Sequence, residues 1–494
     1  MRSLKDLEFW FVTGSQPLYG DDAIQACIKH ADDMISKMNE FGLPCKIVNK
    51  GVVTCTEEIT KVMKEVNYCD ACAGVIIFAH TFSPSKMWIK GLVELNKPLL
   101  HLHTQYNKEI PYDTMDMDFM NLNQSAHGDR ETGFIASRLR MNRKVVMGHW
   151  EDPEVTKRIA AWMRSAAGVV LGKELKICRF GDNMRYVGVT EGDKVEVEIK
   201  LGWECNTYAV GDLAKAIDAC TEEEVDAKMA EYTSKYDMNT DNIDSVRYQA
   251  RCEIAMEKFF AENDFSAFTN TFQDLVGMRQ LPGIATQNLM AKGIGYGGEG
   301  DWKTAALDTI MKKMAEGLPG GTAFMEDYTL NLIPGNELIM GAHMLEVDPS
   351  VAATKPKIEV HELGIGGKEP PARLVFDGKS GKGITCSLVD MGGRLRLICC
   401  DVEAVPCPKP TPNLPVAKCT WRPLPDLQTA AECWIYAGGA HHTVLSFDLT
   451  AEQMEDYADM CGIEFVHIGP ETNVHQFKQD LMLKDVAYKI KGII

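Results

Sequence analysis

Two carboxylates and three imidazoles stand out because each lies beside glycines or within an apolar run. Glu299 lies in the glycine-rich segment "GIGYGGEGDWKTA", and Glu326 follows a glycine pair in "GGTAFMEDYT". His343 lies in "LIMGAHMLEV", and His441 and His442 follow Gly-Gly in "YAGGAHHTV". Mixed carboxylate and imidazole ligands suit Mn²⁺ or another first-row divalent ion better than a closed zinc site. The spacings match no local metal motif, so these residues alone indicate only a candidate Glu₂His₂ metal site.

Glycines this dense before a helix can also form a phosphate-binding loop. A dinucleotide-binding fingerprint needs a strand before the glycines and an acidic residue about 20 positions after them. Here the glycines follow the helix-like "NLMAKG", and no lysine stands where a Walker loop needs one. The segment therefore favours a carboxylate presented to a divalent cation or used for proton transfer. A helix N-terminus that merely favours a glutamate is the alternative.

The overall composition excludes some partners. The formal net charge of −18 argues against binding to nucleic acid or to an anionic membrane, since both need basic patches. No apolar run approaches the roughly 20 residues of a membrane span, and "MRSLKDLEFWFV" lacks a signal-peptide pattern. The 16 cysteines are diluted along the chain, as in a protein without a disulfide scaffold. We expect a cytoplasmic protein.

The first third of the chain alternates strand and helix patterns, which predicts a doubly wound parallel sheet. In such sheets ligands bind beyond the carboxyl ends of the strands. The loop at 14–20, the loop at 80–88 and the segment after Gln105 should therefore share one edge. The predicted strands are 7–14, 73–80 and 98–105, and the predicted helices are about 21–40 and 56–68.

A second α/β block begins near Lys173 and ends around "GLPGG". Beyond it, the sequence pattern indicates antiparallel strands instead of alternating strands and helices. "ARLVF", "GITCSLVD" and "RLRLICCDVE", joined by "DGKSG" and "MGG", predict a meander of hairpins. Thr450 and Gln453 predict a capping box for a helix that Gly462 ends. We expect three domains, at 1–172, 173–320 and 321–494.

The same residues carry a resemblance that covers essentially the whole chain. "WFVTGSQPLYG", "MDMDFMNLNQSAHG", "CRFGDNMR", "GGEGDWKTAAL", "GAHMLEV", "LGIGGKEPPARL" and "AGGAHHTV" resemble segments of the bacterial L-arabinose isomerase family, in its order. The resemblance implies two Rossmann-like, doubly wound α/β domains followed by an antiparallel β-barrel-like domain, a fold shared with L-fucose isomerase. It also implies a divalent metal, typically Mn²⁺ with Co²⁺ or Mg²⁺ as alternatives, held by Glu299, Glu326, His343 and His442. The two glutamates would also be the catalytic acid/base pair.

The resemblance further implies a sugar pocket and an assembly. Gln124 and His127 would enter the pocket from a neighbouring subunit, because the family assembles as a homohexamer with active sites at subunit interfaces. Gln273 stands where the family often has a glutamate, so no role is carried over to it. The implied substrate-binding residues are Gln16, Leu18, Tyr19, Phe82, Gln124, His127, Met184, Thr269, Phe272 and His441.

The implied reaction is the aldose–ketose interconversion of L-arabinose and L-ribulose in arabinose catabolism, with D-galactose to D-tagatose as a second reaction. Proton transfer between C1 and C2 would pass through a metal-stabilised cis-enediol. A carboxylate bound to a dication is a poorer base, so a metal-assisted hydride shift stays open. Three rival functions remain: an L-fucose isomerase-like enzyme, a metal-dependent sugar hydrolase and a sugar-binding protein without catalysis.

Overall fold

The computed structural model describes residues 1–491, which divide into two compact units. The N-terminal unit comprises Arg2–Val170, and the C-terminal unit begins at Leu171 and also includes Met1. None of the helices in the described range is long and apolar enough to cross a membrane. The domain boundaries near 172 and 320 stay predictions.

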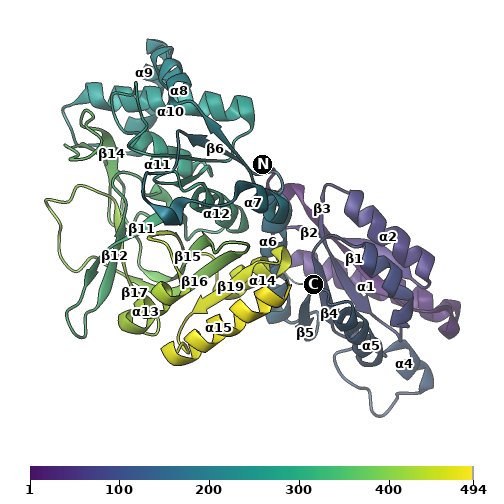
Figure 1. Cartoon of the computed structure of the whole chain (residues 1–494). Helices are drawn as coiled ribbons and strands as arrows, with labels where there is room; N and C mark the ends of the chain where they lie inside the picture. Colours follow the sequence, from purple (N-terminus) through teal and green to yellow (C-terminus); the bar gives the residue numbers. More distant parts are fainter. Residues whose placement is uncertain (492–494) are drawn as a thin grey trace. The chain divides into compact units, whose positions relative to one another are not determined.

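The N-terminal unit is built on a sheet of five parallel strands in the order β2-β1-β3-β4-β5 (Figure 1). β3 is buried over its whole length, and such a continuous apolar run is typical of a parallel strand with helices on both faces. The predicted strands and helices are confirmed. The strands are β1 (Glu8–Gly14), β2 (Lys46–Val53), β3 (Cys72–Ala79), β4 (Leu99–His103) and β5 (Lys144–Met147), and the helices are α1 (Gly20–Glu40), α2 (Thr56–Tyr68), α3 (Ile89–Glu94), α4 (Met117–Leu122), α5 (Ser125–Arg138) and α6 (Pro153–Gly172).

The strand order of this sheet reverses direction between β1 and β3, which is where doubly wound sheets bind ligands. The loops that follow these two strands are bonded to each other. Ser15 Oγ lies 2.9 Å from Thr81 Oγ1, and Gln16 Nε2 donates to the Phe82 carbonyl at 2.9 Å. The predicted common edge of the rim loops is therefore confirmed for these two loops.

The C-terminal unit begins with a second parallel sheet, in the order β10-β9-β6-β7. The prediction that no strand accompanies the glycine-rich segment is wrong, because "GYG" within this segment forms the fourth strand of the sheet, β10. The strands are β6 (Lys176–Phe180), β7 (Glu204–Tyr208), β9 (Ala267–Asn270) and β10 (Gly295–Gly297), and the helices are α7 (Lys194–Leu201), α8 (Val210–Asp218), α9 (Glu222–Lys235), α10 (Ile243–Asn263), α11 (Ile284–Ala291) and α12 (Trp302–Met314).

A mainly antiparallel barrel follows in the same unit (Figure 1, green to yellow). Six strands run in the order β15-β18-β11-β12-β17-β16, and pairing of β15 with β16 closes the ring, while β19 extends β16 as a parallel strand. The β-barrel-like domain is thereby confirmed. The strands are β11 (Thr322–Asn331), β12 (Leu338–Ala342), β15 (Gly381–Asp390), β16 (Leu395–Val405), β17 (Lys418–Pro423), β18 (His442–Ser446) and β19 (Glu464–Ile468), and the helices are α13 (Leu427–Ala437), α14 (Ala451–Cys461) and α15 (Val474–Lys491).

The predicted meander is only partly right. "GITCSLVD" and "RLRLICCDVE" form the β15–β16 hairpin, but "ARLVF" forms β14 (Ala372–Val375) in a separate sheet with β13 (Lys357–Val360) and β8 (Asp237–Met238). Gln287 of α11 explains the difference, because its side-chain amide bonds both the N–H and the carbonyl of Leu374, at 2.7 and 3.1 Å. The capping box of Thr450 and Gln453 is confirmed.

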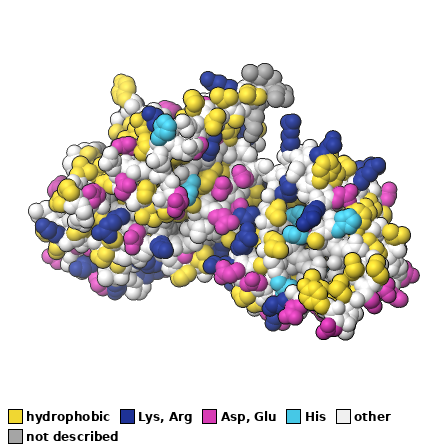
Figure 2. Space-filling model, turned by 90° about the horizontal axis from the view of Figure 1, so that it is seen from below, with side chains coloured by type: hydrophobic (Ala, Val, Ile, Leu, Met, Phe, Trp, Pro, Cys, Tyr) yellow, Lys and Arg dark blue, Asp and Glu magenta, His cyan; other side chains and the backbone are white. Residues whose placement is uncertain are grey.

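The surface carries both signs of charge. On the face seen in Figure 2, Lys and Arg side chains are interspersed with Asp and Glu, and no continuous basic region forms there. Interspersed charges of both signs are typical of a solvated surface.

Candidate metal centre

The register of the barrel strands brings three of the predicted metal ligands together. Glu326 of β11 lies opposite Ala342 of β12 on one side and opposite His442 of β18 on the other. His343 follows Ala342 directly, and its Nε2 lies 4.0 Å from Glu326 Oε2. Cross-strand neighbours lie about 5 Å apart, so antiparallel pairing assembles a cluster that the sequence spacing could not show.

Glu299 reaches the same cluster from the α/β part of the C-terminal unit. It lies between β10 and α12, just beyond the carboxyl end of a parallel strand, and its Oε2 is 3.2 Å from Nε2 of His441. Ligand atoms of Glu299, His441 and His442 all lie within 4.8 Å of one another. The structure therefore gathers the four predicted metal ligands and His441 in one place.

Glu299 has a left-handed backbone, with a φ of 60°. A side chain other than glycine is strained in this conformation by about 1 kcal/mol or more, so surrounding contacts must hold it. The carbonyl of Glu299 accepts a hydrogen bond of 2.8 Å from Met184 N, and Gly300 N donates to the Asn270 carbonyl at 2.9 Å. The loop is thus bonded on both sides of the residue that presents the carboxylate.

Glycines of this segment allow its backbone to lie close to His343, to α12 and to the segment at 182–183. A Cβ on Gly298 would lie 2.8 Å from Nε2 of His343 and would block this nitrogen. A Cβ on Gly300 would collide with the backbone of Asp182 and Asn183, and one on Gly295 would collide with Ala305 and Thr309 of α12. The glycines therefore allow the loop to pack against the neighbouring elements while His343 stays accessible.

Gly300→Ala should lower the melting temperature of the protein by several degrees, because it combines a φ of 79° with a backbone collision. Gly293→Ala is the matched control: its φ is 88°, but nothing lies within 4 Å of the added Cβ. Strain alone costs about 1 kcal/mol, so this control should shift the melting temperature much less. Equal shifts in thermal denaturation of the two variants would contradict the packing role of Gly300.

Buried carboxylates orient the two imidazoles that are predicted to bind metal. His343 Nδ1 lies 2.5 Å from Glu346 Oε2, and His442 Nδ1 lies 3.1 Å from Asp301 Oδ2. A carboxylate accepts from an N–H, so each ring carries its proton on Nδ1 and turns the lone pair of Nε2 into the cluster. This carboxylate–histidine arrangement is the usual support of a metal-ligating imidazole.

The donor set fits a divalent cation. His442 is fully buried, yet its Nε2 has no hydrogen-bond partner within the described residues, which is costly unless something binds it. His441 differs, because its Nε2 already contacts Glu299. Two carboxylates and two imidazoles match the types of ligand that Mn²⁺ accepts.

The electrostatics of the cluster favour ionised carboxylates at Glu299 and Asp301 and a neutral His442. Burial would lower the pKa of His343, but the carboxylates around it, Glu346 above all, raise it. Burial would raise the pKa of Glu299, but the hydrogen bond from His441 and the nearby imidazoles lower it below its ordinary value. Burial lowers the pKa of His442. Burial would also raise the pKa of Asp301, but the Lys303 ammonium, His442 and the hydrogen bond from Thr304 together hold it below its ordinary value. Glu299 and Asp301 are therefore ionised and His442 is neutral at neutral pH.

Sequence reasoning missed Asp301 and Glu346. Asp301 also caps the N-terminus of α12, where Thr304 Oγ1 donates to it at 2.7 Å and Lys303 Nζ lies 3.2 Å away. Glu346 stands three residues after His343 and accepts a further bond of 3.1 Å from Leu345 N. A carboxylate close in sequence to each predicted ligand was the available signal, but acidic residues are too common for it to be specific.

The predicted sugar-binding residues of the N-terminal unit gather at its switch point. Phe82 stacks on His127 with ring centroids 4.1 Å apart, and Gln124 Oε1 lies 3.4 Å from His127 Nδ1. Gln16 bonds the Phe82 backbone, as described above. In the loop after β1, Leu18 is 80% exposed, and Tyr19 is half-buried. Their roles in binding sugar stay predictions.

The remaining predicted residues surround the metal cluster. The Phe272 ring lies 6.2 Å from the ring of His343. Met184 bonds the Glu299 backbone, and Thr269, which is fully buried, donates from its hydroxyl to the Gly297 carbonyl at 2.6 Å. Gln273 accepts a hydrogen bond of 3.0 Å from Arg185 N. Thr269 and Met184 thus support the loop that carries Glu299.

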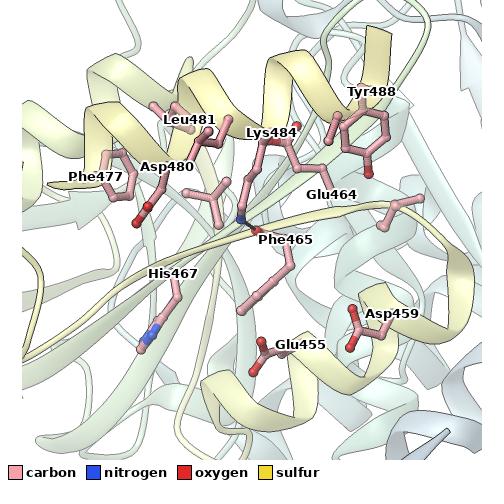
Figure 3. A pocket seen from close by; sticks show the side chains of 14 residues that line it. Glu455, Asp459, Glu464, Phe465, His467, Phe477, Asp480, Leu481, Lys484 and Tyr488 are labelled. Atoms are coloured by element: carbon pink, nitrogen blue, oxygen red, sulfur yellow. Dashed lines mark hydrogen bonds between the residues drawn. The ribbon is translucent and has the colours of Figure 1, made fainter. Parts of the chain in front are cut away.

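A cavity of about 650 Å³ lies elsewhere in the C-terminal unit, between α14, β19 and α15 (Figure 3). Lys484 reaches across it to the Phe465 carbonyl, and Glu464 is paired with Arg394 and Arg396. None of the predicted site residues lines this cavity.

The fold and the cluster define a class of protein: an α/β enzyme with a closed barrel and a mixed carboxylate–imidazole centre. Comparison with known sequences makes the class specific. Residues 3–174, 176–317 and 321–464 match the N-terminal, central and C-terminal domains of L-arabinose isomerase. The chain belongs to the L-arabinose isomerase family, and it is an aldose–ketose isomerase.

Full-length relatives support this assignment. The chain is 54% identical to the L-arabinose isomerase of Geobacillus stearothermophilus, over 99% of this chain and 100% of the relative. It is 51% identical to the enzyme of Bacillus subtilis and 53% identical to that of Clostridium beijerinckii, again over 99% of this chain and 100% of each relative. The similarity therefore extends over all the elements that carry the cluster.

Proposed function

We propose that this isomerase interconverts L-arabinose and L-ribulose, with D-galactose to D-tagatose as a slower second reaction, in the cytoplasm. One observation carries the proposal: two carboxylates converge with two imidazoles, and the buried Nε2 of one of them, His442, has no partner within the described residues, in a chain whose relatives are named for this reaction. D-Galactose shares the configuration of L-arabinose at the reacting end, which is why it should be accepted.

Glu299, Glu326, His343 and His442 would hold the cation, with Mn²⁺ preferred and Co²⁺ or Mg²⁺ as alternatives. The cation supplies Lewis-acid polarisation of the sugar oxygens at C1 and C2. Asp301 and Glu346 fix the two rings, so the imidazoles need no reorientation when a ligand arrives.

Glu299 and Glu326 are the proposed proton-transfer pair. Their carboxylates approach from different parts of the fold, one from the loop before α12 and the other from β11. Two carboxylates can serve the two ends of a proton transfer: one would remove the C2 proton, and the other would manage the hydroxyl proton as a cis-enediol forms and collapses. His441 contacts Glu299 and its pKa is raised, chiefly by this hydrogen bond, so it can stabilise the ionised carboxylate.

The sugar would be enclosed by a second subunit of a homohexamer, through Gln124 and His127. Contacts within the N-terminal unit extend this proposal. Phe82 stacks on His127 and Gln16 bonds the Phe82 backbone. Because these residues form one packed group, the active site that receives His127 should receive Phe82 and Gln16 from the same subunit.

A ketose-formation assay tests the function. The full-length protein is stripped with EDTA and assayed on L-arabinose, D-galactose and L-fucose, before and after MnCl₂ is restored. We expect ketose from L-arabinose, less from D-galactose and at most a trace from L-fucose, in each case only after Mn²⁺ is added. Preference for L-fucose would favour an L-fucose isomerase-like enzyme, and hydrolysis of a sugar lactone without ketose would favour a hydrolase.

The same assay in D₂O tests the proton-transfer route. A cis-enediol exchanges its carbon-bound proton with solvent, so deuterium should appear at C1 of the L-ribulose product. Complete absence of deuterium at C1 would favour a hydride shift.

A further inference from the structure

The mouth of the barrel contains a hollow of about 320 Å³ that no predicted role explains. Strands β11, β12, β15, β16 and β17 contribute to its wall, and α13 lies along one side. Mouths of β-barrels are preferred places for small-molecule sites, and this volume lies at the lower end of their usual range.

Asp327 is the one acidic residue in the wall of this hollow. Successive residues of a strand point to opposite faces, so Asp327 faces away from the metal cluster that Glu326 enters. Its carboxylate has one long side-chain contact, 3.5 Å from Thr443 Oγ1. No Lys or Arg lines the hollow, and its one imidazole, that of His441, is already paired with the Glu299 carboxylate.

Aromatic side chains form much of the remaining wall. Trp421, Trp434 and Tyr328 line the hollow together with aliphatic groups such as Ile339. Trp434 is fixed in place, because its indole N–H donates to the Ala440 carbonyl at 2.9 Å. A carboxylate beside aromatic rings is the combination that attracts an organic cation, through an ion pair and through cation–π contact.

We propose that the mouth of the barrel binds a small organic ammonium ion, which pairs with the Asp327 carboxylate and packs its apolar part against Trp421 and Trp434. The site is separate from the metal cluster but shares a wall with it. His441 lines the hollow and also contacts Glu299, and Asp327 N donates to the His441 carbonyl at 3.0 Å. This inference does not depend on the proposed sugar substrate.

Ligand-observed NMR titration of the full-length, Mn²⁺-loaded protein tests the proposal, with benzylammonium as the probe and benzyl alcohol as its uncharged analogue. Both titrations are run at pH 8, at which the benzylammonium probe keeps its proton. Benzylammonium should bind at least about tenfold more tightly than benzyl alcohol, since a charged partner strengthens the hydrogen bond. Equal binding of the two probes would overturn the proposal.

Four variants locate the site. Asp327→Asn should abolish the preference for the charged probe, and Ala431→Phe, which places a larger side chain in the hollow from α13, should remove binding of both probes. Glu432→Gln removes a carboxylate from the exposed side of α13 and should change nothing. Glu299→Gln should retain binding, because the probe does not occupy the metal cluster. Unchanged binding in Ala431→Phe, or loss of binding in Glu299→Gln, would contradict a site at the barrel mouth.

Discussion

Glu299→Gln should lower kcat for ketose formation by at least about 10³-fold at saturating Mn²⁺, because it removes an anionic ligand and a proton-transfer group together. Glutamine has nearly the same shape and meets the same strain at a φ of 60°, so the melting temperature should barely change. Glu326→Gln should reduce kcat to a similar extent. Its position in β11, paired on both sides, keeps the substituted side chain in place.

The measurement is a ketose assay over a series of Mn²⁺ concentrations, together with thermal denaturation. Saturation with Mn²⁺ separates loss of metal affinity from loss of proton transfer, since only the former is recovered by added metal. Glu262→Gln, which removes an exposed carboxylate on α10, is the matched control and should behave as the unmodified enzyme. Near-normal kcat in either Glu299→Gln or Glu326→Gln would remove that residue from the catalytic pair.

Glu346→Gln should weaken Mn²⁺ binding by about 10- to 100-fold, the usual effect of losing a carboxylate that orients a ligating imidazole. Glu346 does not enter the cluster itself but holds Nδ1 of His343 at 2.5 Å. A glutamine can present its amide nitrogen to that ring as well as its oxygen, so the orientation of Nε2 is no longer fixed. Isothermal titration of the EDTA-stripped protein with MnCl₂ gives the affinity directly, without reference to activity.

Asp301→Asn tests the same role at His442, but it also leaves the Lys303 ammonium without its carboxylate. Breaking a buried ion pair in this way costs about 3–5 kcal/mol, so this variant should lower the melting temperature as well. Glu346→Gln therefore gives the cleaner test of the two. If its Mn²⁺ affinity equalled that of Glu262→Gln, Glu346 would have a structural role only. A raised Mn²⁺ requirement with a recovered kcat is the result expected of a positioning residue.

Much of the fold follows from local pattern. The buried run of β3 and the apolar face of α1 indicate a parallel sheet with helices packed on it, and both are where the sequence places them. Local sequence patterns did not predict which strands pair with each other where that pairing depends on residues far away in the chain. β14 has the pattern of a barrel strand, yet Gln287 of α11 bonds its backbone and holds it in another sheet.

For the candidate site as well, local sequence indicated the residues, but not that they lie together. Residue type and flanking sequence pointed to Glu299, Glu326, His343 and His442, and family resemblance gave them a common role. Their proximity depends on strand register, because a shift of one residue would turn Glu326 away from the cluster and bring Asp327 into it. No local rule predicts that register across 116 residues, the separation of Glu326 from its partner His442 in β18.

The sequence by itself determined which side chains could bind a metal and which segments had to be strands, helices or tight glycine turns. Those properties depend on residue chemistry and on neighbours within a few positions. Only the tertiary structure decided that Asp301 and Glu346 orient the imidazoles, that Glu299 has a left-handed backbone, and that Asp327 faces a separate hollow. Each of these depends on contacts between elements far apart in the chain, whose energies become apparent only once the elements pack together.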